Sequence, residues 1–139
     1  YSGKTKFMPI HCSDLTDVIY HVISKNINSK IIECVGPETI TFKEIIERLL
    51  ELIRKKRFLL SLPLPLAKLS AKFFQLFPNP LLTQDQLRLL KYDNIKSGKY
   101  KTNSEIGVPS TRFFNEEVEK YCYMWREGGE FSKDKYNLK

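Results

Sequence analysis

Apolar residues recur every three or four positions along most of this chain, which is the repeat of an amphipathic α-helix. Polar or proline-containing stretches separate the apolar runs. The pattern predicts helices over about residues 13–25, 42–53, 66–77, 83–92 and 111–127. We therefore expect a mostly helical chain in which each helix turns one apolar stripe toward a core.

Two short stretches have the composition of β-strands. Residues 6–12 (KFMPIHC) contain Pro9, which places the first strand at an edge or a bend. Residues 30–35 (KIIECV) are rich in β-branched side chains, and Gly-Pro at 36–37 stops the second strand. Residues 93–108 are polar and contain glycine, so they are predicted to form a loop. The expected fold class of this chain is α+β, mostly helical with two or three short strands.

Local signals mark where the helices begin and end. Thr41 and Glu44 form a capping box, in which each side chain satisfies a free backbone N–H of the first helical turn. Thr83 and Gln86 repeat that spacing. The basic run at 54–57 follows the second helix, where positive charge offsets the helix dipole, and this local role explains the run without a nucleic-acid partner.

The predicted strands are too few to form a stable sheet of their own. We interpret them as the last strands of a larger sheet, and the start at Tyr1, without Met, as the middle of a longer protein. An exposed strand edge and an unfilled apolar face are then expected, and the edge could support a homo-oligomer. Residues 1–127 would form the C-terminal part of that protein, and residues 128–139 a flexible tail.

Charge and cysteine content narrow the partners and the compartment. With 23 Lys and Arg against 16 Asp and Glu, the net charge is +7, which favours acidic partners. No helix has a continuous basic stripe, so nucleic-acid binding ranks last. Cys12, Cys34 and Cys122 lie far apart, which argues against disulfides and zinc and favours buried thiols in a reducing compartment. The expected location is cytoplasmic or matrix-like, in contact with a membrane surface at most, because no apolar run reaches the ~20 residues of a membrane span.

Two segments resemble extended, atypical short-chain dehydrogenase/reductases, the NAD-dependent epimerase/dehydratase-like proteins. Residues 7–18 (FMPIHCSDLTDV) are similar to the strand-to-helix segment of that family. Residues 30–44 (KIIECVGPETITFKE) are similar to its strand with Gly-Pro-Glu and the capped helix that follows, and this match is the more specific. Residues 62–67 (LPLPLA) and 80–94 resemble a narrower branch, which includes the dehydrogenase-like accessory subunit of respiratory complex I and its bacterial relatives.

The resemblance implies a parent protein with a Rossmann-like α/β half that binds NAD or NADP. The glycine-rich loop that holds the dinucleotide does not occur in this chain, so no cofactor is expected on it alone. Tyr92 and Lys96 have the spacing of the family's catalytic Tyr-x-x-x-Lys, but they lie at the wrong place in the order and are treated as chance. We expect no catalytic residue in this chain, and a Rossmann half or a neighbouring subunit as its partner.

Few residues qualify as ligand contacts. His11 follows a strand, where α/β sheets bind ligands, and could donate a hydrogen bond to substrate or cofactor. The competing interpretation is that His11 bonds the backbone of the next turn. Gln84 and Arg88 fall on one helix face and could meet an anionic substrate. Asp14 and Asp17 lie in a first helical turn, where helix caps and the dipole already favour acids.

Two further groups of apolar residues have open interpretations. The segment from Leu59 to Leu82 is rich in Leu and Phe and flanked by basic charge. It could be a lid over a hydrophobic ligand, a docking site for a respiratory-complex subunit or a membrane surface, or part of the core. The aromatic residues of the last helix are interpreted as core rather than as a base-stacking platform; they are Phe113, Phe114, Tyr121 and Trp125.

Taken together, the resemblance implies the substrate-binding and interaction portion of an NAD(P)-binding protein. That protein would be an accessory or assembly factor of a respiratory NADH:quinone oxidoreductase. The alternative is the C-terminal part of an active nucleotide-sugar epimerase/dehydratase or NAD(P)-dependent reductase. On either interpretation this chain alone would not be catalytic.

Overall fold

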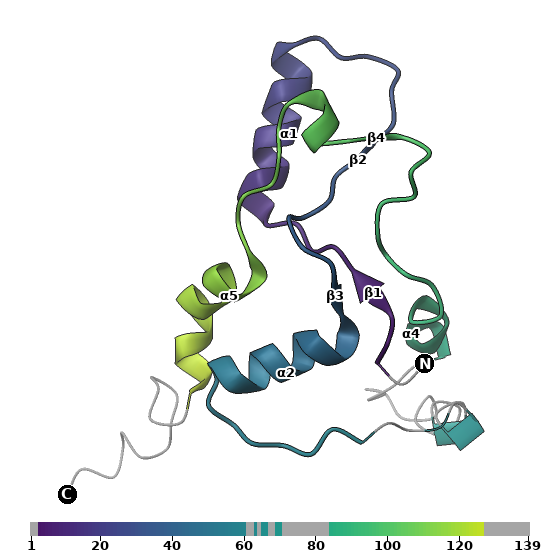
Figure 1. Ribbon diagram of the computed structural model, residues 1–139, viewed down its shortest axis with the longest axis vertical. Helices are drawn as coiled ribbons and strands as arrows, with labels where there is room; N and C mark the ends of the chain where they lie inside the picture. The colour runs from purple at the N-terminus through teal and green to yellow at the C-terminus, as the bar shows by residue number, and fades with distance from the viewer. Residues whose placement is uncertain (1–2, 61–62, 64, 67–68, 71–83, 127–139) are drawn as a thin grey trace, which may run out of the picture.

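The computed structural model describes residues 3–60, 63, 65–66, 69–70 and 84–126. Figure 1 shows helix α1 at one end of the molecule and helices α2 and α5 at the other, with short strands between them. The described helices are α1 (Cys12–Ser24), α2 (Phe42–Leu52), α4 (Gln84–Leu89) and α5 (Phe114–Cys122), with 3-10 turns η1 (Ser104–Ile106) and η2 (Tyr123–Trp125). The chain mixes helices with a few short strands, as expected for an α+β fold.

The strands form two separate two-stranded sheets. Strand β1 (Lys6–Phe7) pairs antiparallel with β3 (Ile40–Thr41), with Phe7 opposite Ile40. Strand β2 (Ile32–Glu33) pairs parallel with β4 (Lys101–Thr102), with Glu33 opposite Thr102. Each described strand is two residues long, which is below the usual range for strands.

The loop predicted over residues 93–108 is confirmed for most of its length, but the prediction missed β4 and η1 within it. Distant contacts hold it in place. The Asn103 backbone N–H donates to the Glu33 carbonyl at 3.1 Å, and the Ser97 N–H donates to the Glu33 carboxylate at 2.8 Å. A polar segment therefore gains strand structure from a partner that lies far away in the sequence.

Helix boundaries agree with the sequence where the start signal is local. The Thr41–Glu44 capping box is present, with the Glu44 N–H donating to Thr41 Oγ1 at 3.2 Å. The carboxylate of Glu44 accepts from the N–H and the hydroxyl of Thr41 in return, and these two bonds lower the pKa of Glu44. The predicted cap at Thr83 and most of the predicted helix 66–77 lie outside the described residues, as does the predicted tail 128–139.

Several boundaries differ from the prediction. The strands predicted over 6–12 and 30–35 are limited to Lys6–Phe7 and Ile32–Glu33. Helix α1 is capped by His11 rather than by Ser13 or Asp14. Helix α4 ends at Leu89 rather than near Tyr92. Helix α5 begins at Phe114 rather than at 111, because distant groups bind the backbone and side chains of the segment before it.

The apolar core of the described residues is small. Its buried members are Val18, Ile40, Leu87, Val118 and Cys122. Four polar side chains are buried with them: Thr5, Asp14, Thr102 and Asn103. Polar contacts therefore contribute a large share of the packing between elements, and each buried polar group must find a partner.

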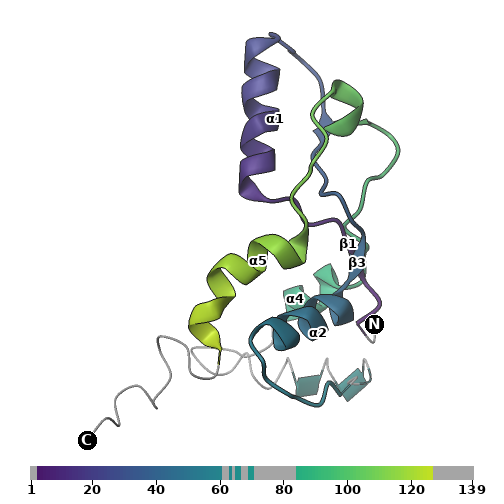
Figure 2. The same ribbon diagram turned by 60° about the vertical axis from the view of Figure 1, so that its left-hand side comes forward.

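Much of the apolar surface stays in contact with water. Along α1, Leu15, Ile19 and Ile23 are 36%, 51% and 73% exposed. Figure 2 shows that α1 projects away from α2 and α5, so these helices do not cover it. Phe113, Tyr121 and Trp125 are 44%, 51% and 62% exposed, so the interpretation of the last helix's aromatic residues as core is wrong for these three. None of the described helices has the length and hydropathy needed to cross a bilayer.

Candidate binding site beside His11

A cavity of about 210 Å³ lies between the segment that precedes α1 and the first turns of α5. Residues 9–11 form one wall. Residues 112–114, with Glu117, Val118 and Tyr121, form the other. The predicted ligand contact His11 is thus placed at a concave surface, together with polar groups from a distant part of the chain.

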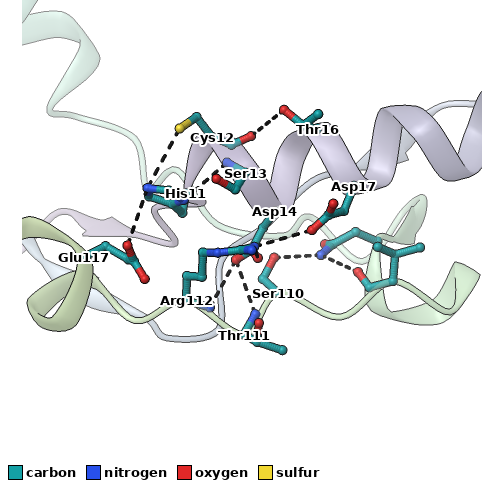
Figure 3. A network of polar contacts seen from close by, with 12 residues as sticks. His11, Cys12, Ser13, Asp14, Thr16, Asp17, Ser110, Thr111, Arg112 and Glu117 are labelled. Carbon is teal, nitrogen blue, oxygen red and sulfur yellow. Dashed lines mark hydrogen bonds and ion pairs between the residues drawn. The ribbon is translucent and has the colours of Figure 1, made fainter.

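His11 holds the first turn of α1 and also borders this cavity. Its Nδ1 accepts a hydrogen bond from the Ser13 N–H at 3.2 Å, which is the cap of the helix (Figure 3). The interpretation that His11 bonds the backbone of the next turn is confirmed. Because Nδ1 is an acceptor, the neutral ring carries its proton on Nε2. Nε2 lies 3.8 Å from a carboxylate oxygen of Glu117 and 3.8 Å from the Cys12 sulfur.

Cys12 is exposed, so its predicted burial is wrong. The thiol lies beside His11, but the geometry does not make a nucleophile and base pair. A general base needs a free lone pair on the nitrogen that faces the thiol. In His11 that nitrogen, Nε2, carries the proton, and the lone pair of Nδ1 is used by the cap. Cys34 is half-buried, and burial raises the pKa of its thiol.

An ion pair between Asp14 and Arg112 closes one side of the site (Figure 3). The Asp14 side chain is 4% exposed, and its carboxylate also accepts from the N–H groups of Thr111 and Arg112 at 3.3 and 3.2 Å. The guanidinium of Arg112 reaches Asp17 at 3.4 Å as well. These carboxylates, Asp14 first, raise the pKa of Arg112. Asp14 is therefore a tertiary contact rather than the expected helix cap.

The remaining polar groups of the cavity are poorly suited to proton transfer at neutral pH. Lys120 donates to the Glu117 carboxylate at 2.7 Å and lowers its pKa, with further contributions from His11 and Arg112. Partial burial raises the pKa of Tyr121. Glu117 therefore stays ionised and Tyr121 stays protonated, whereas a catalytic acid or base works best with a pKa near the ambient pH. The site can bind a small ligand through hydrogen bonds and apolar contact.

The other two predicted ligand contacts are on α4. Arg88 donates to Asp85 at 3.1 Å, and both side chains are largely exposed. Arg88 is not among the described residues that line the cavity. Helix α4 lies instead near β1, where the Asn94 N–H donates to the Lys6 carbonyl at 2.8 Å. The structure does not bring Arg88 to His11, and the role of Gln84 and Arg88 with a substrate stays a prediction.

The Gly-Pro-Glu segment contributes two contacts that sequence reasoning missed. A Cβ at Gly36 would lie 1.7 Å from the Pro9 carbonyl oxygen, so the backbone approaches too closely for any other residue. Glu38 accepts from the Phe114 N–H at 3.0 Å and from Arg48 at 2.7 Å. Glu38 thus caps α5 and ties it to α2. Only the motif itself hinted at these roles.

Asn103 also connects distant segments of the chain, and the sequence did not indicate this role. Its side chain is 1% exposed. Its Oδ1 accepts from the Val35 N–H at 3.0 Å, and its Nδ2 donates to Val108 and Ser110 at 3.1 and 2.9 Å. The Ser110 hydroxyl donates in turn to the Val35 carbonyl at 2.8 Å. These bonds join the segment before α5, through Ser110, to Val35 in the segment that follows β2.

Metal binding has no support within the part of the chain that the structure describes. No group of three or more His, Cys, Asp and Glu side chains there is placed to hold an ion. Comparison with models of known protein families gives no match to this chain, and comparison with curated proteins gives none either.

Proposed function

We propose that this chain is the substrate-side and interaction portion of an NAD(P)-binding protein of the extended short-chain dehydrogenase/reductase type. That protein would serve as an accessory or assembly factor of a respiratory NADH:quinone oxidoreductase. The observation that carries the proposal is the exposed apolar stripe of α1, formed by Leu15, Ile19 and Ile23. An apolar helix face of this kind is buried when a neighbouring layer packs on it.

The strands support a missing neighbour in the same way. Among the described residues, β2 pairs only with β4, so its other edge is open. Ile31, which precedes β2, is 61% exposed. An unpaired strand edge beside exposed apolar side chains is what remains when a larger sheet lacks its other strands. A Rossmann half of the parent would supply those strands and the dinucleotide site.

Residues that carry the family resemblance also have structural roles in this fold. Gly36 permits the close approach to Pro9, and Glu38 caps α5. The Thr41–Glu44 capping box starts α2. Gly36 and Glu38 each lie at a contact between segments that are distant in the sequence, and this agreement supports the resemblance.

An accessory role is favoured over catalysis by the chemistry of the cavity beside His11. Arg112 is neutralised by Asp14 and Asp17, which makes it a poor partner for the diphosphate of a nucleotide sugar. Glu117 and Tyr121 have pKa values displaced away from neutrality. The alternative, an active epimerase/dehydratase or reductase, is favoured by one observation, which is that the cavity borders His11 in the segment between β1 and α1.

The test is to tag the gene at the codon for Lys139 and purify the protein from its native cells. We expect a polypeptide that retains NAD or NADP, detected by nicotinamide fluorescence after release, and that co-fractionates with NADH:quinone oxidoreductase activity. Replacement of Ile19 and Ile23 by Ser should lower both the amount of retained nucleotide and the amount of co-fractionating oxidoreductase activity. A purified protein that holds no nicotinamide nucleotide and separates from the oxidoreductase would overturn the proposal. Substrate-dependent change in nicotinamide absorbance would favour the enzyme instead.

A further inference from the structure

A basic run and an apolar run lie next to each other on the surface after α2. Lys55, Lys56 and Arg57 are followed directly by Phe58, Leu59 and Leu60. Phe58 and Leu60 are 99% and 91% exposed, and Leu59 is 42% exposed. Large apolar side chains in water are unfavourable, and such a concentration marks a surface that another body covers.

The helix dipole does not account for the position of the basic run. Helix α2 ends at Leu52, and its last turn contains no basic residue. Arg54, the first residue of the basic run at 54–57, has a φ of 57°, which turns the chain out of the helix. The Lys55 N–H still donates to the Leu50 carbonyl at 2.9 Å, so Lys55 lies at the helix end. Because the dipole acts within the last turn only, Lys56 and Arg57 lie beyond its useful range. The helix dipole therefore does not explain why the whole run at 54–57 is basic.

The two runs border a groove of about 400 Å³ against the flank of α2. Lys43, Lys55, Lys56 and Arg57 line it with one acidic residue, Glu47, which lies 3.4 Å from Lys43. Within the described residues, Lys55, Lys56 and Arg57 form no ion pair. The groove therefore has uncompensated positive charge beside exposed apolar groups.

We propose that residues 55–60, with Lys43, form a docking surface for an anionic membrane. The cations contact acidic lipid headgroups, and Phe58 and Leu60 enter the boundary between headgroups and acyl chains. Charge and apolar burial then add in one binding mode, as they do in peripheral membrane proteins. Phe and Leu are among the side chains found on the buried face of interfacial segments. The inference goes beyond the proposed function, because lipid binding here does not require a nucleotide-binding half.

The full 139-residue chain is tested by co-sedimentation with vesicles. One set is phosphatidylcholine alone, and the other contains phosphatidylserine as well. We expect binding to the acidic vesicles that weakens as salt is added. Replacing Lys55, Lys56 and Arg57 with Gln should lower the partition coefficient roughly 100-fold, since each cation near an acidic bilayer contributes about 1 kcal/mol. Phe58→Ser with Leu60→Ser should lower it roughly 10-fold or more.

A matched control separates this surface from overall charge. Lys30, Lys99 and Lys101 line a different groove, of about 460 Å³, and replacing them with Gln removes the same number of charges. That control should retain nearly all vesicle binding. A variant with Lys55 and Lys56 replaced by Arg should also bind, and circular dichroism should show that every variant stays folded.

Three outcomes would overturn the inference. One is equal loss of binding in the two triple-Gln variants, which would mean that net charge alone acts. The second is equal binding to neutral and acidic vesicles. The third is failure to bind vesicles while an acidic, leucine-rich peptide binds with the same residue dependence, which would assign the surface to a protein partner. None of these outcomes depends on nicotinamide binding, so the proposed function is judged separately.

Discussion

Two regions of α1 differ in how their side chains are satisfied. One is the joint, where Asp14 binds Arg112 in the segment before α5, and the other is the outer face, formed by Leu15, Ile19 and Ile23. At the joint, Asp14 is buried and accepts from Arg112 and two backbone N–H groups. On the outer face, a few residues along the same helix, Ile19 and Ile23 are largely exposed and apolar. Polar groups are thus satisfied inside, and apolar groups are left outside.

The contrast shows what holds this chain together and what remains for a partner. Polar contacts with defined geometry fix which segments meet, because a buried donor or acceptor without a partner is costly. Apolar area lowers the free energy only when something covers it. In this chain the buried polar groups have partners, but many apolar side chains are still exposed and can be covered by a partner. The following substitutions test this contrast.

The largest effect is expected at Gly36. In Gly36→Ala, the new Cβ would lie 1.7 Å from a backbone carbonyl oxygen that cannot move aside. We expect a loss of more than about 4 kcal/mol, enough to unfold a marginally stable chain, measured by urea unfolding followed by circular dichroism. Gly98→Ala is the control, since its Cβ meets nothing within 4 Å and only its φ of 74° costs about 1–2 kcal/mol. Similar stabilities for the two variants would contradict the close approach.

Asp14→Ala comes next, because it leaves Arg112 and two N–H groups without their buried acceptor. Arg112 is 35% exposed and can turn to water, so the cost comes mainly from the lost buried acceptor, about 2–3 kcal/mol, and thermal unfolding should show it. Asp14→Asn keeps an acceptor oxygen and should cost less. Asp17→Ala removes a carboxylate that is 62% exposed and should cost about 1 kcal/mol at most. If Asp14→Ala lowered the free energy of unfolding no more than Asp17→Ala, the contact between Asp14 and Arg112 would not be what holds these two segments together.

Glu38→Ala should have an intermediate effect. It removes the acceptor for the first N–H of α5 and the partner of Arg48. Loss of such a cap costs about 1–2 kcal/mol, and hydrogen exchange should show increased opening at the start of α5. Glu47→Ala, which breaks an exposed pair with Lys43, should cost less than about 0.5 kcal/mol. Unchanged protection of α5 in Glu38→Ala would show that α5 is held by other contacts.

The smallest effect on stability is expected on the outer face. Ile19→Ser with Ile23→Ser should change the free energy of unfolding of the chain alone by about 0.5 kcal/mol or less, because both side chains already meet water. The same variant should self-associate less in sedimentation velocity. Val18→Ala, at a site that is 2% exposed, should cost about 2 kcal/mol. If the double-Ser variant were as unstable as Val18→Ala, the outer face would contribute to the stability of the chain alone, contrary to our interpretation.

The sequence by itself determined the elements whose signals are local. Helix spacing located α1 and α2, and the Thr41–Glu44 box located the start of α2, because these interactions join residues three or four positions apart. The mixed class, helices with a few short strands, followed from the same patterns. The placement of His11 as a helix cap was also within reach, since its partner Ser13 is two positions away.

Only the tertiary structure decided the rest. Asp14 meets the backbone of Arg112 across 98 positions, Glu38 reaches Phe114 across 76, and Asn103 reaches Val35 across 68. No local pattern encodes such pairs, so the strand at Lys101, the start of α5 and the cavity beside His11 did not follow from the sequence. Whether an apolar stripe is covered is likewise a property of the neighbours that the folded chain brings to it, and the spacing of Leu15, Ile19 and Ile23 alone could not tell.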